Sequence, residues 1–347
     1  MRRATFFICL ISVFFFVLGV TFINSTQTAL AAGKVIKWKL QAVYPSASPS
    51  YQGSTLVVID KIKKRTNGRL VIEPFTAGAL VPSKEIYNAV QRGMIQAGMG
   101  SANYLRDRMP VMTFAASICF NFTEVWQGQY LFKQLGLEDI LREESLKHGV
   151  YYFSDRIYPT ELVCKKPITK LDDFKGLKLR SSGAIKVFLT QIGAAASYIT
   201  GAEVYPSLAS GVIDGAHWGA AQGADKMGFY EICKYHLKPS LNMGAPDAWF
   251  FNKKKFDALP KDIQKIALDT LEEHFWYRSN EYIYLEGKAL AKALKERGVK
   301  ISMIEPAEQV KIRKLAQAMW LEESKKSPAS KKAYDIMIGY MKDLGLL

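Results

Sequence analysis

The sequence contains few of the side chains, and none of the short motifs, that mark well-defined catalytic centres. Among its 347 residues are only four histidines, and neither a G-x-S-x-G nucleophile motif nor an H-E-x-x-H metal motif occurs. A clear pair of catalytic carboxylates is missing as well. We therefore predict no enzymatic activity and assign no catalytic residue. An exported hydrolase that uses Glu161, Asp214 and His217 is the alternative.

Cysteine is also scarce, with four residues in the whole chain. Cys9 lies in an N-terminal apolar run, which leaves Cys119, Cys164 and Cys233 for the folded part. Three thiols form at most one disulfide, and their spacing fits no metal motif. We expect buried thiols that pack as small apolar side chains. The sequence leaves open whether two of them pair.

A long apolar run occurs only at the N-terminus. Met1–Arg3 is basic, Phe6–Val20 is almost wholly apolar, and Ala29–Ala31 gives an A-x-A cleavage pattern. We predict that residues 1–31 form a cleaved secretory signal peptide, so that the mature protein is periplasmic. An uncleaved membrane anchor is the alternative, which the polar residues 24–28 before the small-residue site disfavour.

Basic residues outnumber acidic ones, 47 to 32, which gives a formal net charge of +15. Such an excess suits anionic small molecules, membrane surfaces or nucleic acids. The lysines, however, are spread along predicted helices such as 253–265 and 288–300. No RNA-binding aromatic motif or zinc spacing accompanies them. We predict a solvated basic surface and no nucleic-acid partner.

The chain is organised around residues 171–218. A strand at 177–180, a helix at 184–192, a second helix from 201 and a strand within 211–218 follow the pattern of a parallel βαβ unit. Ligands bind beyond the carboxyl ends of such strands, where Arg180 and Trp218 are placed. Because a guanidinium forms two parallel hydrogen bonds with a carboxylate, Arg180 is the predicted centre of an anion site.

The remaining elements predict a second parallel sheet and a two-lobed α/β clamp, in which each lobe is a sheet flanked by helices and a hinge joins them. A helix from about 260 to 297 is long enough to span both lobes. We assign 32–157 plus 249–285 to lobe I and 158–248 plus 286–347 to lobe II. Further expected strands are 35–43, 70–75, 94–100, 149–153, 247–252 and 299–303, and further expected helices are 51–65, 82–92, 123–148, 306–324 and 330–344.

The order and spacing of several motifs resemble those of the TRAP (tripartite ATP-independent periplasmic) transporter solute-binding proteins. The motifs run through nearly the whole mature chain: Thr66–Arg69, Ala89–Gly93, Leu171–Arg180, Glu203–Leu208 and Gly211–Ala216. The resemblance implies a periplasmic binding protein fold that closes over a small organic acid, often a dicarboxylate or another carboxylate, and delivers it to a TRAP membrane permease. A sensory or scavenging module would use the same clamp.

The resemblance also implies that Arg180 pairs with the ligand carboxylate, whereas the alternative for this residue is a surface ion pair with Asp172 or Asp173. In a branch that binds 2-oxo acids, a metal is held partly by a Glu-Trp pair, and this chain has His217-Trp218 there. Since imidazole suits hard cations poorly, we assign no metal ligand and no cofactor, and the sequence leaves open whether a metal takes part in binding. The other candidate ligand-binding residues are Tyr44, Tyr104, Glu161, Tyr205, His217, Trp218 and Trp249.

Overall fold

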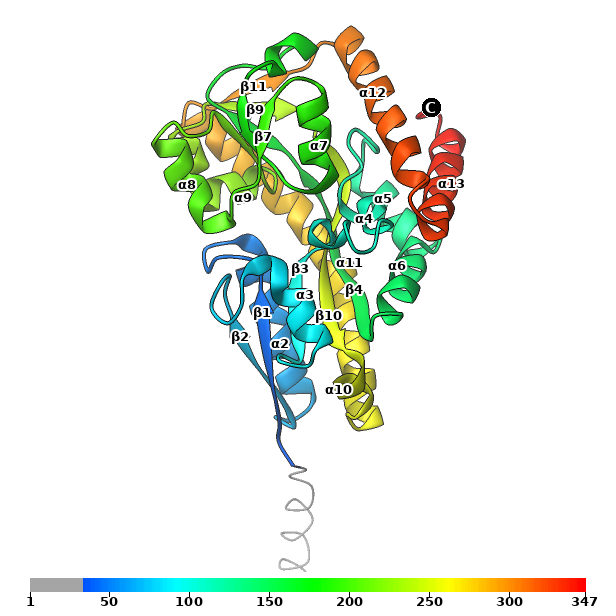
Figure 1. The fold of residues 1–347 in the computed structure, drawn as a ribbon. Coiled ribbons are helices and arrows are strands. Elements are labelled where there is room, and N and C mark those ends of the chain that lie inside the picture. Colours follow the sequence, from blue (N-terminus) through cyan, green and yellow to red (C-terminus); the bar gives the residue numbers. More distant parts are fainter. Residues whose placement is uncertain (1–33) are drawn as a thin grey trace, which may run out of the picture.

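The computed structural model describes residues 34–347, so the predicted signal peptide at 1–31 lies outside the described part of the chain. Two lobes are present, each built on one β-sheet with helices against it (Figure 1). The predicted two-lobed α/β fold is therefore confirmed. No helix between residues 34 and 347 is both long enough and apolar enough to cross a membrane.

The first sheet has five strands in the order β2-β1-β3-β10-β4. As predicted, β1 is parallel to β2 and to β3, but β10 is antiparallel to both β3 and β4. The parallel arrangement predicted for the first three strands is thus confirmed, while the sheet as a whole is mixed, because β10 returns from the second lobe and enters from the opposite end. The strands are β1 (Ile36–Ala42), β2 (Leu70–Phe75), β3 (Ala97–Ser101), β4 (Val150–Thr160) and β10 (Asn242–Asn252).

The second sheet has six strands in the order β11-β9-β5-β8-β6-β7. Strand β6 is parallel to both β7 and β8, which confirms the βαβ pattern predicted around residues 171–218. Strand β5 continues the chain directly from β4 and is antiparallel to β8 and β9. The strands are β5 (Leu162–Cys164), β6 (Lys178–Arg180), β7 (Ala195–Ser197), β8 (Gly215–His217), β9 (Tyr235–Lys238) and β11 (Lys300–Met303).

The helices follow the expected positions, with one correction. The single helix expected at 123–148 is two helices, α5 and α6, because Gly136 adopts a left-handed backbone with φ of 80° between them. The helices are η1 (Tyr51–Thr55), α2 (Leu56–Arg65), η2 (Ser83–Glu85), α3 (Ile86–Gln91), η3 (Ala102–Leu105), α4 (Met112–Ala116), α5 (Val125–Lys133), α6 (Leu137–Leu146), η4 (Leu171–Phe174), α7 (Gly183–Gln191), α8 (Gly201–Ala209), α9 (Ala221–Lys226), η5 (Phe229–Glu231), α10 (Lys253–Asp257), α11 (Lys261–Glu296), α12 (Pro306–Ser324) and α13 (Pro328–Asp343).

Helix α11 runs along both lobes (Figure 1). Its 36 residues give a length of about 54 Å at 1.5 Å per residue. It contacts β4 and α2 in the first lobe and α9 in the second. The predicted helix from about 260 to 297 that spans both lobes is therefore confirmed.

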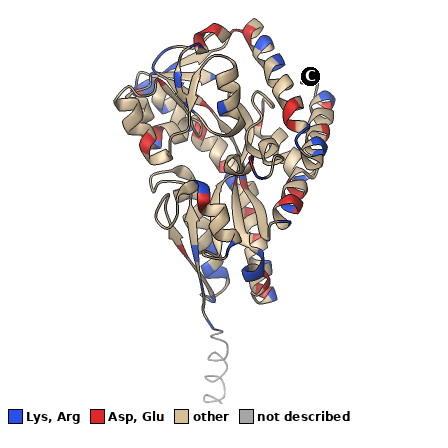
Figure 2. Cartoon of the chain, viewed as in Figure 1, with Lys and Arg blue, Asp and Glu red and all other residues tan. Residues whose placement is uncertain are grey.

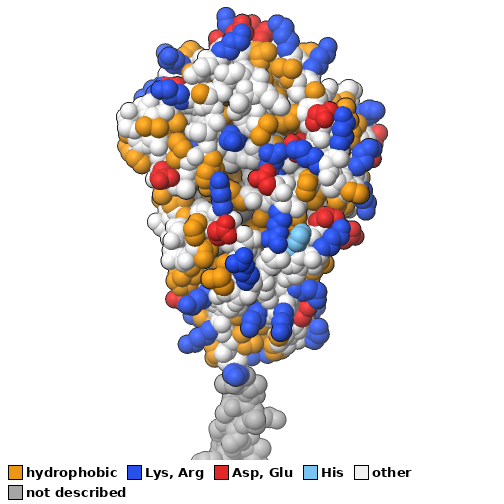
Figure 3. Space-filling model, in the orientation of Figure 1, with side chains coloured by type: hydrophobic (Ala, Val, Ile, Leu, Met, Phe, Trp, Pro, Cys, Tyr) orange, Lys and Arg blue, Asp and Glu red, His pale blue; other side chains and the backbone are white. Residues whose placement is uncertain are grey.

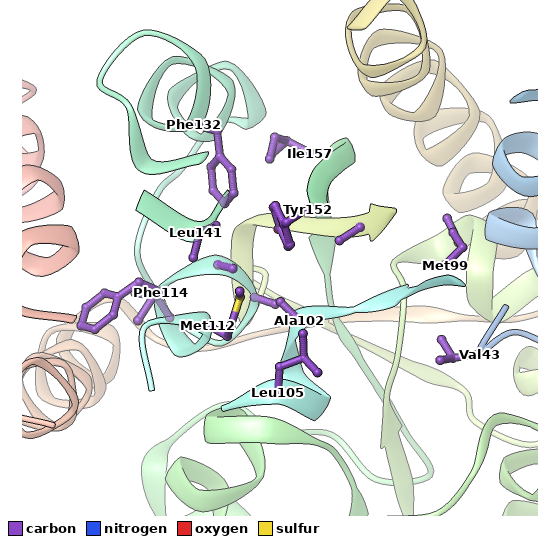
Figure 4. Close-up of a cluster of buried hydrophobic side chains, with 14 of the residues drawn as sticks. Val43, Met99, Ala102, Leu105, Met112, Phe114, Phe132, Leu141, Tyr152 and Ile157 are labelled. Atoms are coloured by element: carbon purple, nitrogen blue, oxygen red, sulfur yellow. The ribbon is translucent and has the colours of Figure 1, made fainter. Parts of the chain in front are cut away.

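A continuous apolar core ties the first sheet to helices α4, α5 and α6. Figure 4 shows Phe132 of α5 and Leu141 of α6 beside Tyr152 and Ile157 of β4. All four side chains are buried. Strand β4 is thus fixed from its helix-covered face before it crosses toward the second lobe.

The C-terminal helices connect the two lobes on one side of the molecule (Figure 1). Helix α12 contacts η4 in the second lobe, and α13 contacts α4, α5 and α6. The predicted division places 286–347 in lobe II and α4–α6 in lobe I. The C-terminal segment therefore reaches back from one predicted lobe to the other.

Charged side chains are dispersed over the surface. In Figures 2 and 3, Lys and Arg residues alternate with Asp and Glu over both lobes and along α12 and α13. The three cysteines of the described chain, Cys119, Cys164 and Cys233, are free and buried. Burial raises the pKa of each of these thiols.

Candidate functional site

A cavity lies between the two sheets and is lined from both lobes. It has a volume of about 60 Å³. Since a water molecule needs about 10–15 Å³ on this scale, the cavity has room for about four to six waters or a comparably small organic molecule. Its principal polar lining residues are Tyr44, Ser50, Tyr104, Tyr158, Arg180, Ser182, His217 and Tyr282.

The position of Arg180 follows from the βαβ unit. Strand β6 pairs in parallel with β8, and Arg180 lies opposite Ala216 in that register. The carboxyl ends of β6 and β8 therefore meet at one edge of the sheet, which brings Arg180 beside His217 and Trp218. All three of these predicted site residues line the cavity.

The guanidinium of Arg180 is held by backbone carbonyls. Its Nε donates to the carbonyl of Ile199 at 3.0 Å, and its Nη1 donates to that of His217 at 2.6 Å. The side chain is buried, with 3% exposure. Among residues 34–347 no carboxylate lies within ion-pair distance of it. Arg180 is therefore a buried cation whose carboxylate partner is not part of the described chain.

The alternative of a surface ion pair for Arg180 is wrong. Asp172 instead pairs with Lys175 at 2.8 Å. Asp173 accepts hydrogen bonds from the backbone amides of Thr169 and Lys170. Both carboxylates thus stabilise the turn that precedes β6 and do not contact the cavity.

Aromatic rings surround the Arg180 guanidinium. Its central carbon lies 4.6 Å from the ring centre of Trp218 and 5.9 Å from that of Tyr198. Burial lowers the pKa of Arg180, while the hydroxyls of Tyr104 and Tyr198 act in the opposite direction. The guanidinium stays charged because its ordinary pKa exceeds 12. The rings shield that charge from water and leave it to face the cavity.

His217 lines the cavity and has one unpaired ring nitrogen. Its Nδ1 and the hydroxyl of Ser181 are 2.9 Å apart, while its Nε2 is buried without a hydrogen-bond partner in the described chain. Burial, followed by the charge of Arg180, lowers the pKa of His217 to about 3. The imidazole is therefore neutral near pH 7.

The first lobe contributes a rigid polar wall. The hydroxyls of Tyr44 and Tyr158 both donate to Asp247, and the hydroxyl of Ser50 does so at 2.8 Å. Behind them, Arg156 pairs with Asp247 at 2.9 Å. Tyr44 thus lines the cavity at the predicted position, and its phenol is oriented by a fully buried ion pair.

Tyr104, in η3 after β3, lines the cavity as well. Its ring meets that of Tyr198 from the second lobe edge to face, with ring centres 5.9 Å apart. The two hydroxyls are 3.5 Å apart. Sequence reasoning missed Tyr198, which directly follows β7, the neighbour of the Arg180 strand.

Glu161 and Trp249 were predicted at the site but lie outside the cavity. Glu161 is buried between β4 and β5, where it pairs with His236 and Lys238. Burial raises the pKa of Glu161, but these two partners outweigh it and hold the pKa at about 2. Trp249 is fully buried in the first lobe, and its Nε1 donates to Asp155 at 2.8 Å.

Tyr205, the third predicted residue outside the cavity, lies on the outer face of α8. Its side chain is 36% exposed, and its hydroxyl donates to Glu231 at 2.5 Å. These positions show why none of the three can touch a molecule in the cavity. Glu161 and Trp249 are enclosed by other partners, and Tyr205 faces solvent.

The geometry also contradicts the hydrolase alternative. With a pKa of about 3, His217 is too weak a base for proton abstraction near neutral pH. Asp214 accepts a hydrogen bond from the backbone amide of Lys178 at 2.9 Å, and Glu161 is paired elsewhere. The three residues therefore do not form a catalytic group.

Residues 41–326 match the family model of the bacterial extracellular solute-binding proteins, family 7, known as DctP. The chain belongs to this family. The resemblance to TRAP solute-binding proteins is thus confirmed, and the family is a substrate-binding transport component and not an enzyme.

Two curated relatives of this solute-binding protein cover most of its length. A monocarboxylate 2-oxoacid-binding periplasmic protein from Nostoc is 26% identical over 324 residues, 92% of this chain and 88% of the relative. The C4-dicarboxylate-binding periplasmic protein DctP from Rhodobacter capsulatus is 23% identical, over 81% of this chain and 84% of the relative.

Solved structures of TRAP solute-binding proteins share the fold. One from Bordetella bronchiseptica, with copurified calcium and picolinate, has a TM-score of 0.82 at 24% identity and covers 90% of this chain and 94% of that one. Another from Pseudoalteromonas atlantica, with bound sodium and pyruvate, has a TM-score of 0.83 at 22% identity, with coverage of 90% and 96%.

The cavity of this chain does not fit such a cation. Sodium and calcium bind carboxylate and carbonyl oxygens, and calcium takes six to eight of them. The residues that line the cavity include no aspartate or glutamate. The polar side chains that line it are hydroxyls, the amide of Asn103, the imidazole of His217, the indole of Trp218 and the guanidinium of Arg180.

Proposed function

We propose that this protein captures a small organic acid with one carboxylate and delivers it to the membrane permease of a TRAP transporter. The observation that carries the proposal is Arg180, a buried cation that faces the cavity with no carboxylate of the described chain beside it. A charge in this position is stabilised when an anion fills the cavity. The small volume and the single guanidinium favour a short monocarboxylate over a larger acid with two carboxylates.

The mechanism is closure of the two lobes around the acid. In the open form, Arg180 is accessible on the second lobe. The acid forms hydrogen bonds to the guanidinium, and Tyr44 and Tyr104 of the first lobe then close over it. Exclusion of water strengthens the ion pair, because the effective dielectric constant falls. The closed pair of lobes is the form that the permease would recognise.

The family and the sequence both support a periplasmic location. Export by a signal peptide that is cut after Ala31 would place the mature protein in the periplasm. N-terminal sequencing of the protein purified from its native host tests this, because the first residue should be Ala32. An intact Met1 would contradict cleavage.

The decisive experiment compares wild type with Arg180→Ala by calorimetric titration against small organic acids that raise the melting temperature of the wild type. Loss of one partner of a buried charge pair costs about 2–5 kcal/mol, so the affinity should fall at least about 30-fold. Arg65→Ala, on the outer helix α2, is the matched control and should bind normally. Unchanged affinity in Arg180→Ala, with a normal circular dichroism spectrum, would remove Arg180 from the site.

A further inference from the structure

A second hollow adjoins the candidate site. This hollow, which lies around Lys186 and Tyr198 and is called the outer pocket below, has a volume of about 290 Å³, against about 60 Å³ for the inner cavity. Asn103, Tyr104 and Ser182 line both spaces. Tyr198 lines only the outer pocket, and its ring meets that of Tyr104 edge to face. This pair of tyrosines therefore lies between the inner cavity and the outer pocket.

Both lobes contribute cations to the outer pocket. In the first lobe, Lys84 belongs to η2 and Arg106 follows η3, whereas Lys186 belongs to α7 of the second lobe. Among the described residues that line the pocket, Asp107 is the one acid. Arg106 pairs at 2.8 Å with Glu323, which does not line the pocket. The lining charge is thus predominantly positive.

The ammonium groups of Lys84 and Lys186 are not neutralised by the protein. No aspartate or glutamate between residues 34 and 347 lies within ion-pair distance of either group. Nζ of Lys84 instead lies 4.3 Å from the centre of the Tyr198 ring, across the two lobes. An aromatic face attracts a cation but carries no net charge, so the positive charge of Lys84 remains. A hollow lined mainly by one sign of charge concentrates ions of the opposite sign.

We propose that the outer pocket is the entry site of the acid, where Lys84 and Lys186 attract the anion before it reaches Arg180. This inference rests on the proposed function, because it needs an anionic ligand. Tyr104 and Tyr198 then meet behind the acid when the lobes close. The two lysines set how fast the acid is captured, and Arg180 sets how tightly it is held.

The first test measures association by stopped-flow tryptophan fluorescence of the full mature protein at about 10 mM salt, where charges act over about 30 Å. The probes are acetate, propionate, lactate and pyruvate, and the tightest binder of the four is used. Lys84→Gln combined with Lys186→Gln removes two charges. A unit charge about 8 Å from the anion changes the encounter rate about twofold in water, so the double variant should associate about fourfold more slowly.

The matched control removes the same charge elsewhere. Lys254 and Lys255 are exposed on α10, at the end of the first lobe remote from the second (Figure 1). Lys254→Gln combined with Lys255→Gln should associate as wild type does, because the change in net charge is equal but lies far from the outer pocket.

A variant of opposite sign separates charge from structure. Asp107→Asn removes the one acid of the outer pocket and should speed association about twofold. At about 1 M salt, where charges act over only about 3 Å, wild type and all variants should associate at nearly equal rates. A purely structural effect of these substitutions would neither reverse its sign with the charge nor disappear in salt.

The outcomes distinguish this inference from the function on which it rests. If an acid binds but the lysine double variant and Asp107→Asn both associate at the rate of the control, the entry site is wrong and the proposed function stands. A loss that appears only in the dissociation rate would also overturn the inference, because the outer pocket would then hold the acid and not admit it. If none of the four acids binds to wild type, the proposed function fails and the inference fails with it.

Discussion

The guanidinium of Arg180, the last residue of β6, lies over the indole of Trp218, which directly follows the adjacent parallel strand β8. The separation is 4.6 Å, and the same guanidinium bonds to the carbonyl of the residue before Trp218. The indole and the two backbone carbonyls thus hold the guanidinium in place together. We therefore expect acid binding to depend on this contact as well as on the charge of Arg180.

Removing the indole should weaken acid binding. A desolvated cation–π contact is worth about 0.5–2 kcal/mol, so Trp218→Ala should raise the dissociation constant about 2- to 30-fold, and Trp218→Phe should raise it less. Titration calorimetry with the preferred acid measures this. Trp276→Ala, on the exposed face of α11, is the control. Equal affinities for Trp218→Ala and the control would contradict a role for this contact.

A side chain at Gly183 should hinder closure of the lobes. Gly183 has φ of 58°, and a Cβ there would clash with Asn103 Oδ1 and Ser117 Oγ of the facing segment. Gly211 has a similar φ of 78° but open space around it. Both alanine variants should lose about 1 kcal/mol of stability from backbone strain. Only Gly183→Ala should also lose affinity, by about tenfold, because its closed form is less populated.

Small-angle scattering of these two variants with saturating acid distinguishes hindered closure of the lobes from backbone strain alone. Gly211→Ala should contract on binding as wild type does. Gly183→Ala should keep a larger radius of gyration. Identical contraction and identical affinity in the two variants would show that the contact at Gly183 does not limit closure.

The contact between Tyr104 and Tyr198 should slow release of the acid. The rings meet edge to face across the lobes, and Nζ of Lys84 lies 4.3 Å from the centre of the Tyr198 ring. Such an aromatic pair contributes about 0.5–1.5 kcal/mol, so Tyr198→Ala should release the acid about 2- to 13-fold faster.

The association rate should change little in Tyr198→Ala, since most effects of contact mutations appear in dissociation. Stopped-flow tryptophan fluorescence measures both rates. Tyr284→Ala, at an exposed position of α11, is the matched control. A dissociation rate equal to that of the control would show that the contact between Tyr104 and Tyr198 does not slow release of the acid.

Glu286 should make the protein less stable as the pH rises. Burial raises its pKa to about 8, and its Oε2 accepts the backbone amide of Gln222 at 3.0 Å. Between about pH 4.5 and pH 8 the folded state keeps a proton that the unfolded state has released. Stability therefore falls through this window and levels off above pH 8.

Glu286→Gln removes the titrating group and keeps an oxygen acceptor. The variant should match wild type near pH 5 and exceed it at pH 8, by an amount on the order of a few kcal/mol. Urea unfolding at the two values measures the difference. Glu296→Gln, exposed at the end of α11, should show no such change. A constant difference at both values would contradict the raised pKa.

The positions of Arg180 and Trp218 can be predicted from the sequence because both follow from the local βαβ pattern. A βαβ unit brings the ends of its strands to one edge, so two residues 38 positions apart can be placed together without a structure. The first-lobe wall is harder to predict. Tyr158 and Tyr282 come from β4 and α11, and only the packing of α11 against β4 brings them to the cavity.

The errors have equally specific causes. Which face a residue of a long strand occupies depends on alternation, and bulges change that alternation. Strand β10 has register shifts against β4, one of them between Asp247 and Ala248 next to Trp249. Thr160 lines the cavity while Glu161, one position later, faces away. The residue types alone do not show which of two neighbouring residues faces the cavity.

The long helix α11 belongs both to the ligand site and to the connection between the two lobes. Tyr282 of α11 forms part of the cavity wall, and one turn further on Glu286 holds the first turn of α9 in the other lobe. A substitution on this inward face therefore alters both the cavity that holds the ligand and the contact of α11 with the other lobe. Evolution toward a new acid should therefore proceed through the short strand ends around Arg180, where a side chain can change and the hinge keeps its mechanics.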